Sequence, residues 1–223
     1  MNYTIHRGSP ALDLDWESQT WREAETLAVS NFLSRSSDHR PTVQARMLYD
    51  AKNLHVFFHV QDRYVKSVAT NYLDPVCRDS CVEFFVEPVP GKGYFNIEFN
   101  CGGTLLLFYI EDPTRTPEGP TEFKKMEPVK KELAQTIRVA HSMPDVVEPE
   151  IPAPTTWLLQ YSAPISMFEA YVGPLGNLAG QTWRGNFYKC ADRSSHPHWA
   201  SWAPLDSANF HLPQCFAPIT FAK

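Results

Sequence analysis

Residues 79–100, DSCVEFFVEPVPGKGYFNIEFN, decide the fold of this chain. Within them, 80–87 and 94–100 alternate with a period of two, the pattern of a β-strand that turns one face to a core. The apolar face carries Val82, Phe84, Val86, Phe95, Ile97 and Phe99. The opposite face, with its carboxylates and amides, carries Cys81, Glu83, Phe85, Glu87, Tyr94, Asn96, Glu98 and Asn100. We therefore predict two strands, each with a buried apolar face and a polar face on the other side.

The same period of two recurs along most of the chain. Residues 100–103, Asn-Cys-Gly-Gly, are a turn signal that joins 94–100 to 104–110 as a hairpin. Helical patterns are confined to 18–25 and 166–171, and Ser166 is the predicted N-cap of the second helix. Further strands are predicted at 25–33, 43–50, 53–61, 134–141, 156–162, 182–190 and 217–221.

Two stretches, 111–131 and 143–154, are rich in proline and charge. Neither flanking half has enough strands to close a core alone, so we interpret both stretches as long loops of one domain. A chain of 223 residues is long enough for one large β domain, and no internal repeat divides it. The prediction is an all-β, antiparallel two-sheet β-sandwich with long Pro-rich loops, forming a single domain over residues 1–223.

The amino-acid composition excludes some classes of binding partner. Twenty Lys and Arg against 25 Asp and Glu give a net charge of −5, which is the opposite of the basic stripe that nucleic acid requires, so no nucleic-acid partner is expected. No apolar run approaches the ~20 residues that cross a bilayer, so no membrane partner is expected. The sequence as given shows no signal peptide. The compartment therefore stays open: cytoplasmic as written, extracellular or periplasmic if a signal was removed.

Motifs for nucleophilic or metal chemistry are sparse. The five cysteines form no CxxC pair, which favours reduced buried thiols, and no GxSxG occurs. His55, His59 and the pair His196 and His198 lack the spacing of a transition-metal site, so hydrogen-bonded or exposed histidines are the simpler interpretation. Calcium needs no fixed ligand spacing and remains a metal to consider, although no cofactor is required. Its first candidate ligands are Asp13, Asp15, Asp62 and Asp79.

The polar face of 80–87 and 94–100 allows three interpretations. Glu83, Glu87 and Glu98 could work as a general acid and base, form a solvated sheet face, or bind the vicinal hydroxyls of a sugar. Trp199 and Trp202, in a run rich in histidine and proline, are candidate rings for stacking on the apolar face of a sugar. A place in the core is equally expected for each ring.

Six segments, in order along the chain, resemble one known family. They are 12–16 (LDLDW), 21–24 (WREA), 49–56 (YDAKNLHV), 79–86 (DSCVEFFV), 183–190 (WRGNFYKC) and 198–202 (HWASW). Together they resemble carbohydrate-binding module family 9, a group of DOMON-like β-sandwiches. The resemblance implies non-catalytic binding of glucan or xylan chain ends between two aromatic rings, with calcium contributing to the structure.

Carried over residue by residue, the resemblance makes Glu83, Asn96 and Asn209 ligand contacts. Tyr72 is the only match for the first aromatic platform, and the second is Trp199, Trp202 or Phe210.

The predicted function is binding of a mono-, oligo- or polysaccharide through aromatic stacking and polar contacts. The alternative is an enzyme that acts on a sugar-derived substrate with carboxylates or histidines of the same face. A haem-carrying relative would need Met47 or Met167 with a histidine, at positions that match no pattern. The predicted ligand residues are Glu83, Asn96, Glu98, Tyr72, Trp199, Trp202 and Asn209.

Overall fold

The computed structural model describes residues 1–117 and 119–223, and strands are its main regular structure. The strands are β1 (Tyr3–Arg7), β2 (Thr26–Ala28), β3 (Asn31–Phe32), β4 (Thr42–Tyr49), β5 (Asn53–Asp62), β6 (Val65–Ser67), β7 (Cys81–Glu87), β8 (Tyr94–Asn100), β9 (Leu105–Thr116), β10 (Gly119–Pro128), β11 (Arg138–His141), β12 (Val147–Ile151), β13 (Thr155–Pro164), β14 (Thr182–Cys190), β15 (Trp199–Ser201) and β16 (Ala217–Phe221). The helices are α1 (Gln19–Arg22), α2 (Lys131–Ala134) and α3 (Ile165–Val172), and 76–78 and 213–215 form 3₁₀ turns.

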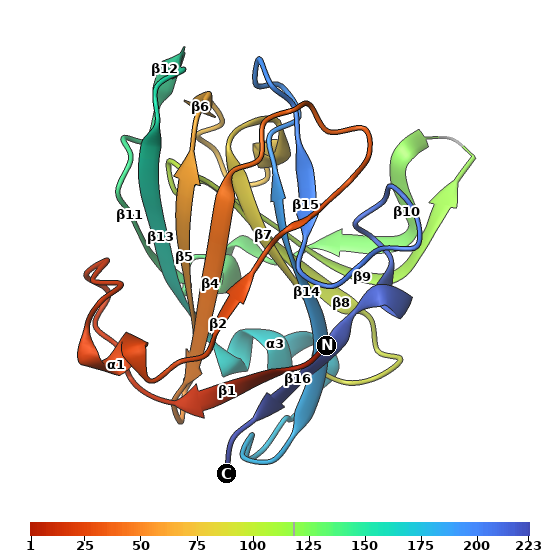
Figure 1. Cartoon of the computed structure of the whole chain (residues 1–223). Helices are drawn as coiled ribbons and strands as arrows, with labels where there is room; N and C mark the ends of the chain where they lie inside the picture. Colours follow the sequence, from red (N-terminus) through yellow and green to blue (C-terminus); the bar gives the residue numbers. More distant parts are fainter. Residues whose placement is uncertain (118) are drawn as a thin grey trace.

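The strands curl into two facing layers (Figure 1). Their order is β10-β9-β8-β7-β14-β16-β1-β4-β5-β13-β11, with β15, β2 and β3 alongside and β12-β6 as a separate pair. Strand β1 joins the layers, because it pairs in parallel with β16 on one side and with β4 on the other. The predicted all-β class is confirmed. The two separate sheets are not observed as such, because β1 makes them one curled sheet.

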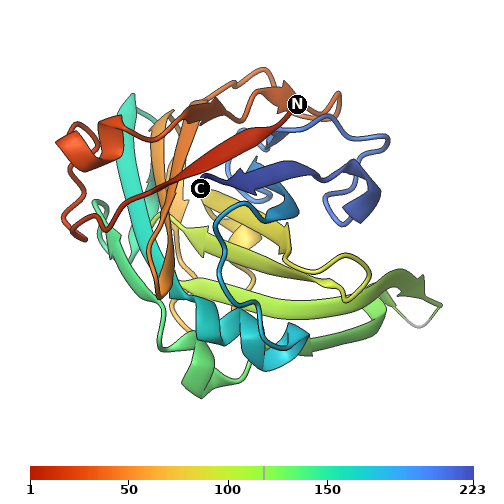
Figure 2. The same cartoon turned by 90° about the horizontal axis from the view of Figure 1, so that it is seen from below.

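The core lies between the layers, where the predicted apolar faces of β7 and β8 meet those of β4, β5 and β13. Aromatic rings fill this space, as when Phe84 stacks on Phe187 of β14 with ring centroids 4.5 Å apart. Helix α3 covers one end of the core (Figure 2), and its Phe168 packs edge-on against Phe95 at 5.1 Å. The alternation in the sequence thus predicts the buried face correctly.

The Pro-rich stretch 111–131 is not a loop, and that prediction is wrong. Most of it belongs to the hairpin of β9 and β10, which is paired from Phe108 and Pro128 outward. Prolines are tolerated there because β10 is an edge strand and because β8 pairs with β9 only as far as Ile110. The second stretch, 143–154, contains the short strand β12.

Several local predictions also change. The N-cap of α3 is Pro164, so Ser166 lies inside the helix, where its side chain makes no cap. The strand predicted at 134–141 is shorter, because α2 occupies its first position. The predicted turn at 100–103 is confirmed, with Gly103 at a φ of 83°. Strands β1, β6 and β15 are too short to give a clear alternation.

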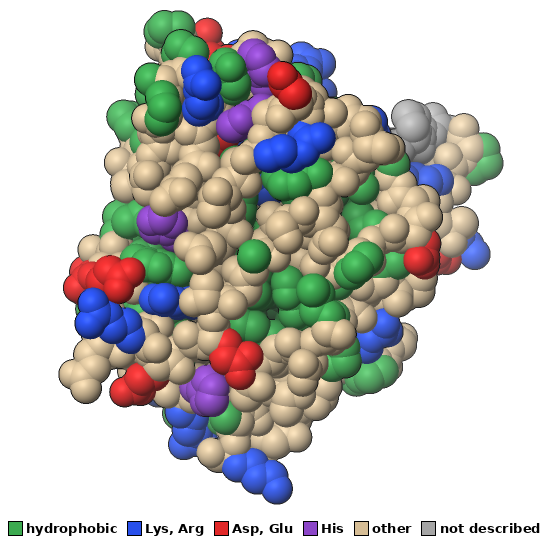
Figure 3. Space-filling view, viewed as in Figure 1, with side chains coloured by type: hydrophobic (Ala, Val, Ile, Leu, Met, Phe, Trp, Pro, Cys, Tyr) green, Lys and Arg blue, Asp and Glu red, His purple; other side chains and the backbone are tan. Residues whose placement is uncertain are grey.

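Charged side chains of both signs are scattered over the face seen in Figure 3, and hydrophobic ones show in hollows between them. Over the described residues, the helices are all too short or too polar to cross a membrane.

Candidate ligand-binding pocket

The polar face of β7 and β8 is covered rather than solvated. All seven residues of each strand are buried, so the interpretation as a solvated sheet face is wrong. A pocket of about 660 Å³ opens over this face. It is lined by β7, β8, β9, β10 and β14, by the 3₁₀ turn at 76–78, and by the segments that follow β3 and β14. The lining residues include Arg35, Cys77, Glu83, Asn96, Glu98, Phe108, Arg115, Phe123, Cys190, Asp192, Trp199, Asn209, Phe210 and His211.

Two carboxyl groups form the floor of the pocket. Glu83 and Glu98 are direct partners in the antiparallel register of β7 and β8 and are 2% and 5% exposed. Burial raises the pKa of Glu98 to about 8. Burial, and then the charge of Glu98, raises the pKa of Glu83 well above its usual range. A protonated carboxyl group can both donate and accept, which suits hydroxyl ligands.

Asn96 holds one of these carboxyl groups. Its Nδ2 donates to Oε1 of Glu98 at 2.8 Å, and its Oδ1 accepts from the backbone N–H of Phe108 at 2.7 Å. The Asn96 amide is therefore hydrogen-bonded through both its nitrogen and its oxygen, and it fixes the orientation of Glu98 in the pocket.

Aromatic side chains form the walls. The half-buried Trp199 donates from Nε1 to Oδ1 of Asp192 at 2.6 Å, and the guanidinium of Arg35 lies 4.3 Å from the centroid of its ring. Phe210 stacks on Tyr188 with centroids 4.2 Å apart and planes inclined by 17°. Trp199 and Phe210 thus each pack against a neighbouring side chain, and both rings line the pocket.

Asn209 also lines the pocket, where its Oδ1 accepts from the backbone N–H of His211 at 3.1 Å. The other two predicted ligand residues do not line it. Trp202 is 4% exposed and packs in the main core against Tyr3 and Phe187. Tyr72 packs against the edge of the same core, and its hydroxyl donates to the carbonyl of Val129.

Sequence reasoning missed several lining residues. Arg35, Asp192 and His211 come from loops that carry no periodic pattern. Arg115 and Phe123 come from the parts of β9 and β10 within 111–131, the stretch that the sequence predicted as a loop. Their position depends on how the β9–β10 hairpin and the C-terminal segment fold over β8, and no local motif encodes that arrangement.

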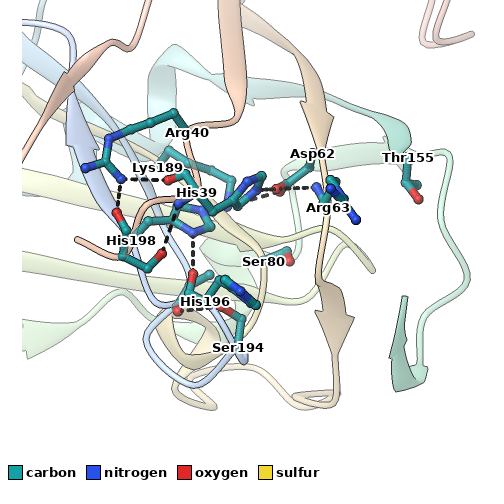
Figure 4. A network of polar contacts seen from close by, with 12 residues as sticks. His39, Arg40, Asp62, Arg63, Ser80, Thr155, Lys189, Ser194, His196 and His198 are labelled. Atoms are coloured by element: carbon teal, nitrogen blue, oxygen red, sulfur yellow. Dashed lines mark hydrogen bonds and ion pairs between the residues drawn. The ribbon is translucent and has the colours of Figure 1, made fainter. Parts of the chain in front are cut away.

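The four aspartates proposed for calcium do not meet. Asp13 and Asp15 accept from backbone N–H groups of their own turn. Asp62 is paired with Lys189 and His39, as Figure 4 shows. Asp79 Oδ2 accepts from two backbone N–H groups and from Asn100. These contacts do not fit a shared calcium ion, which takes six to eight oxygen ligands.

The sequence profile of carbohydrate-binding family 9 matches residues 19–221. The chain belongs to carbohydrate-binding family 9. The resemblance drawn from the six sequence segments is thereby confirmed. Among curated protein sequences, none matches this family 9 chain.

Solved structures agree with this assignment. A proposed carbohydrate-binding protein from Bacteroides uniformis ATCC 8492 is 26% identical, with a TM-score of 0.84 over 99% of this chain and 98% of that one. A family 9 module from Caldicellulosiruptor kristjanssonii in complex with cellotriose is 13% identical, with a TM-score of 0.66 over 100% and 94% of the two chains. A complex of a module from the same organism with glucose is 11% identical, also with a TM-score of 0.66, over 100% and 97%. The Caldicellulosiruptor structures share the fold of this chain.

Proposed function

We propose that this family 9 protein binds a saccharide, without catalysis, in the pocket over β7 and β8. One observation carries the proposal: five ligand residues predicted from sequence line a single pocket, namely Glu83, Asn96, Glu98, Trp199 and Asn209. Its volume of about 660 Å³ falls within the range usual for small-molecule sites. Tyr72 and Trp202 are left out of the proposed site, since neither lines it.

The chemistry of the lining suits a polyhydroxy ligand. Trp199 and Phe210 offer apolar ring surface to the C–H faces of a sugar, and this stacking supplies most of the affinity. Glu83, Glu98 and Asn209 offer donors and acceptors that orient the ring through its hydroxyls. Family 9 relatives bind glucose and cellotriose, so a glucan chain end is the first ligand to test and a xylan end is the second.

The enzyme alternative remains an outcome of the same test, because two carboxyl groups lie in one pocket. Acid–base catalysis by a carboxyl pair uses environments that push the two pKa values apart. Here burial raises the pKa of both Glu83 and Glu98. Burial therefore disfavours the ionised form of both groups, whereas a carboxyl pair that works as acid and base needs one of them ionised.

The proposal is tested by isothermal titration of the purified protein with glucose, cellotriose and xylotriose. We expect one saccharide to bind in the micromolar range. The variants Trp199→Ala and Glu83→Gln should each weaken binding by at least tenfold, about 1.4 kcal/mol. Glu87→Gln is the matched control, since Glu87 lies on the same face of β7 but outside the pocket lining.

Affinities weaker than millimolar for every saccharide tested would contradict the proposed saccharide binding. Release of reducing ends from cellotriose by the wild type, abolished in Glu83→Gln, would replace binding by catalysis.

A further inference from the structure

A second chemical feature lies at the floor of the pocket. Cys81 of β7 and Cys190 of β14 are direct partners in the antiparallel register, and Glu83 follows on the same face of β7. The thiol of Cys190 donates to Oε1 of Glu83 at 3.0 Å. One ligand atom from each of the three residues lies within 4.8 Å of the other two. All three side chains are buried, at 2% exposure or less.

We propose that Cys81, Cys190 and Glu83 bind a thiophilic divalent cation of the zinc type. Two thiolates and one carboxylate form a three-ligand set that zinc accepts in tetrahedral sites that keep an open position. Thiolate sulfur selects zinc and similar metals over calcium or magnesium, which prefer oxygen. The proposed site therefore differs from the predicted calcium ligands, which are aspartates at other positions and offer only oxygen.

The strand geometry favours this role. Facing residues on neighbouring antiparallel strands hold their Cβ atoms about 4.5–5.5 Å apart, and residues i and i+2 share a face. Cys81, Cys190 and Glu83 therefore project from a rigid part of the sheet toward one point. Cys81 and Cys190 belong to the same buried cluster, packed by Val76 and Ala69. A site on paired strands needs little rearrangement to close around an ion.

The acidic neighbours of the cluster also favour a cation. Glu98 is the cross-strand partner of Glu83, and Asp192 lies in the lining of the same pocket. A dication that binds here replaces the protons of the thiols and stabilises the deprotonated ligands.

The site is reachable from solvent. Glu83 and Cys190 line the pocket, and Cys77 lies beside them in the lining. An ion can therefore enter by the route proposed for the sugar, and its open coordination position faces the pocket. The metal site shares Glu83 with the proposed saccharide site but does not depend on it, because its test uses no sugar.

The experiment is a titration of Co²⁺ into reduced, metal-free protein, followed by absorption spectroscopy. We expect one equivalent to bind, with a sulfur-to-cobalt charge-transfer band in the near ultraviolet and d–d bands of a tetrahedral ion. The variants Cys81→Ser and Cys190→Ser should each weaken binding at least tenfold. Cys215→Ser is the control, because Cys215 lies outside the pocket and its thiol donates to Asp206.

A second measurement covers variants that fold poorly. Equimolar Zn²⁺ should raise the Tm of the wild type and of Cys215→Ser, and should leave that of Glu83→Gln almost unchanged. Reduced wild-type protein that binds no Co²⁺ and shows no shift in Tm overturns the proposal, as does equal binding by the serine variants. Since no sugar is present, failure here leaves the saccharide titration unaffected.

Discussion

Lys189 Nζ lies 3.3 Å from Asp62 Oδ2 in the interior, where both side chains are fully buried. Asp62 ends β5 in one layer and Lys189 precedes the end of β14 in the other, so the ion pair links the two layers. His39 Nε2 lies 2.7 Å from Asp62 Oδ1, and Lys189 Nζ lies 2.9 Å from His198 Nε2 (Figure 4). A buried pair of this kind is worth little by itself but is costly to break, because the remaining charge is left without its partner.

The first prediction follows from this asymmetry. Lys189→Met leaves the Asp62 carboxylate buried without its ammonium partner and should lower the free energy of unfolding by about 3–5 kcal/mol. Removing both charges, in Lys189→Met with Asp62→Asn, should recover part of the loss. Urea unfolding followed by tryptophan fluorescence measures both changes. A loss below about 1 kcal/mol in the single variant would contradict a buried link between the layers.

The second prediction concerns acid stability. His198 Nε2 faces the Lys189 ammonium, and its Nδ1–H donates to the carbonyl of His196 at 2.9 Å. Burial, followed by the charge of Lys189, lowers the pKa of His198 to about 3. The unfolded chain, with a histidine pKa near 6.5, binds more protons than the native state between these values. Stability is therefore lost as pH falls from about 6.5 toward 3, by at most about 1.4 kcal/mol per pH unit for this group.

The variant His198→Gln tests this directly, because its amide oxygen can accept from Lys189 and does not titrate. Its free energy of unfolding should fall less steeply than that of the wild type between pH 6 and pH 4. Groups whose pKa shifts the other way, such as Glu98, contribute to both proteins, so the difference between the two curves isolates His198. Parallel curves would show that His198 is protonated in the native state.

Much of the fold follows from the sequence because β-strands with one buried face leave a period of two. Val82, Phe84 and Val86 mark the core side of β7 in this way, and the glycines at 102–103 mark the next turn. The long hairpin of β9 and β10 does not show this pattern, because its outer half is rich in charged residues and prolines, and its Phe123 packs in a separate cluster instead of the main core. Strand β1 was not predicted, because its five residues are too few to show a period of two.

The candidate site was predictable only in part. Glu83 and Glu98 share the polar face of an obvious strand pair, and the sequence places them together. Trp199 and Trp202 illustrate what was missed: an odd spacing of three puts them on opposite sides of an extended segment. One therefore lines the pocket while the other enters the core. Asp192, in contrast, is positioned by a loop, and only the three-dimensional structure brings it to Trp199.

The third prediction separates these two tryptophans. Trp202→Ala opens a cavity beside Tyr3 and Phe187 and should lower the free energy of unfolding by about 3–5 kcal/mol. Trp199→Ala removes a half-buried ring at the pocket and should cost about 1–2 kcal/mol, since less surface is buried. Thermal and urea unfolding of the two variants in one buffer gives the comparison. Equal costs would mean that Trp199 is also a core residue.

The fourth prediction uses two glycines that share a backbone conformation but differ in surroundings. Gly103, in the turn between β8 and β9, has a φ of 83°, and a Cβ there would lie 2.4 Å from Cδ2 of His141. Gly91, before β8, has a φ of 77° and no atom within 4 Å of such a Cβ. The His141 ring cannot move aside freely, because its Nδ1 donates to the carbonyl of Met143 at 2.8 Å.

Gly91→Ala therefore reports the cost of the left-handed backbone alone, about 1–2 kcal/mol. Gly103→Ala adds the displacement of the His141 ring and should cost about 1–3 kcal/mol more, in line with other overpacked sites. Urea unfolding of both variants measures the difference. Adding Gly103→Ala to a His141→Ala background locates the cause of this difference. Without the His141 ring, the alanine at position 103 should cost about as much as Gly91→Ala. If the combined variant keeps the full penalty, the strain lies in the turn itself and not against the ring.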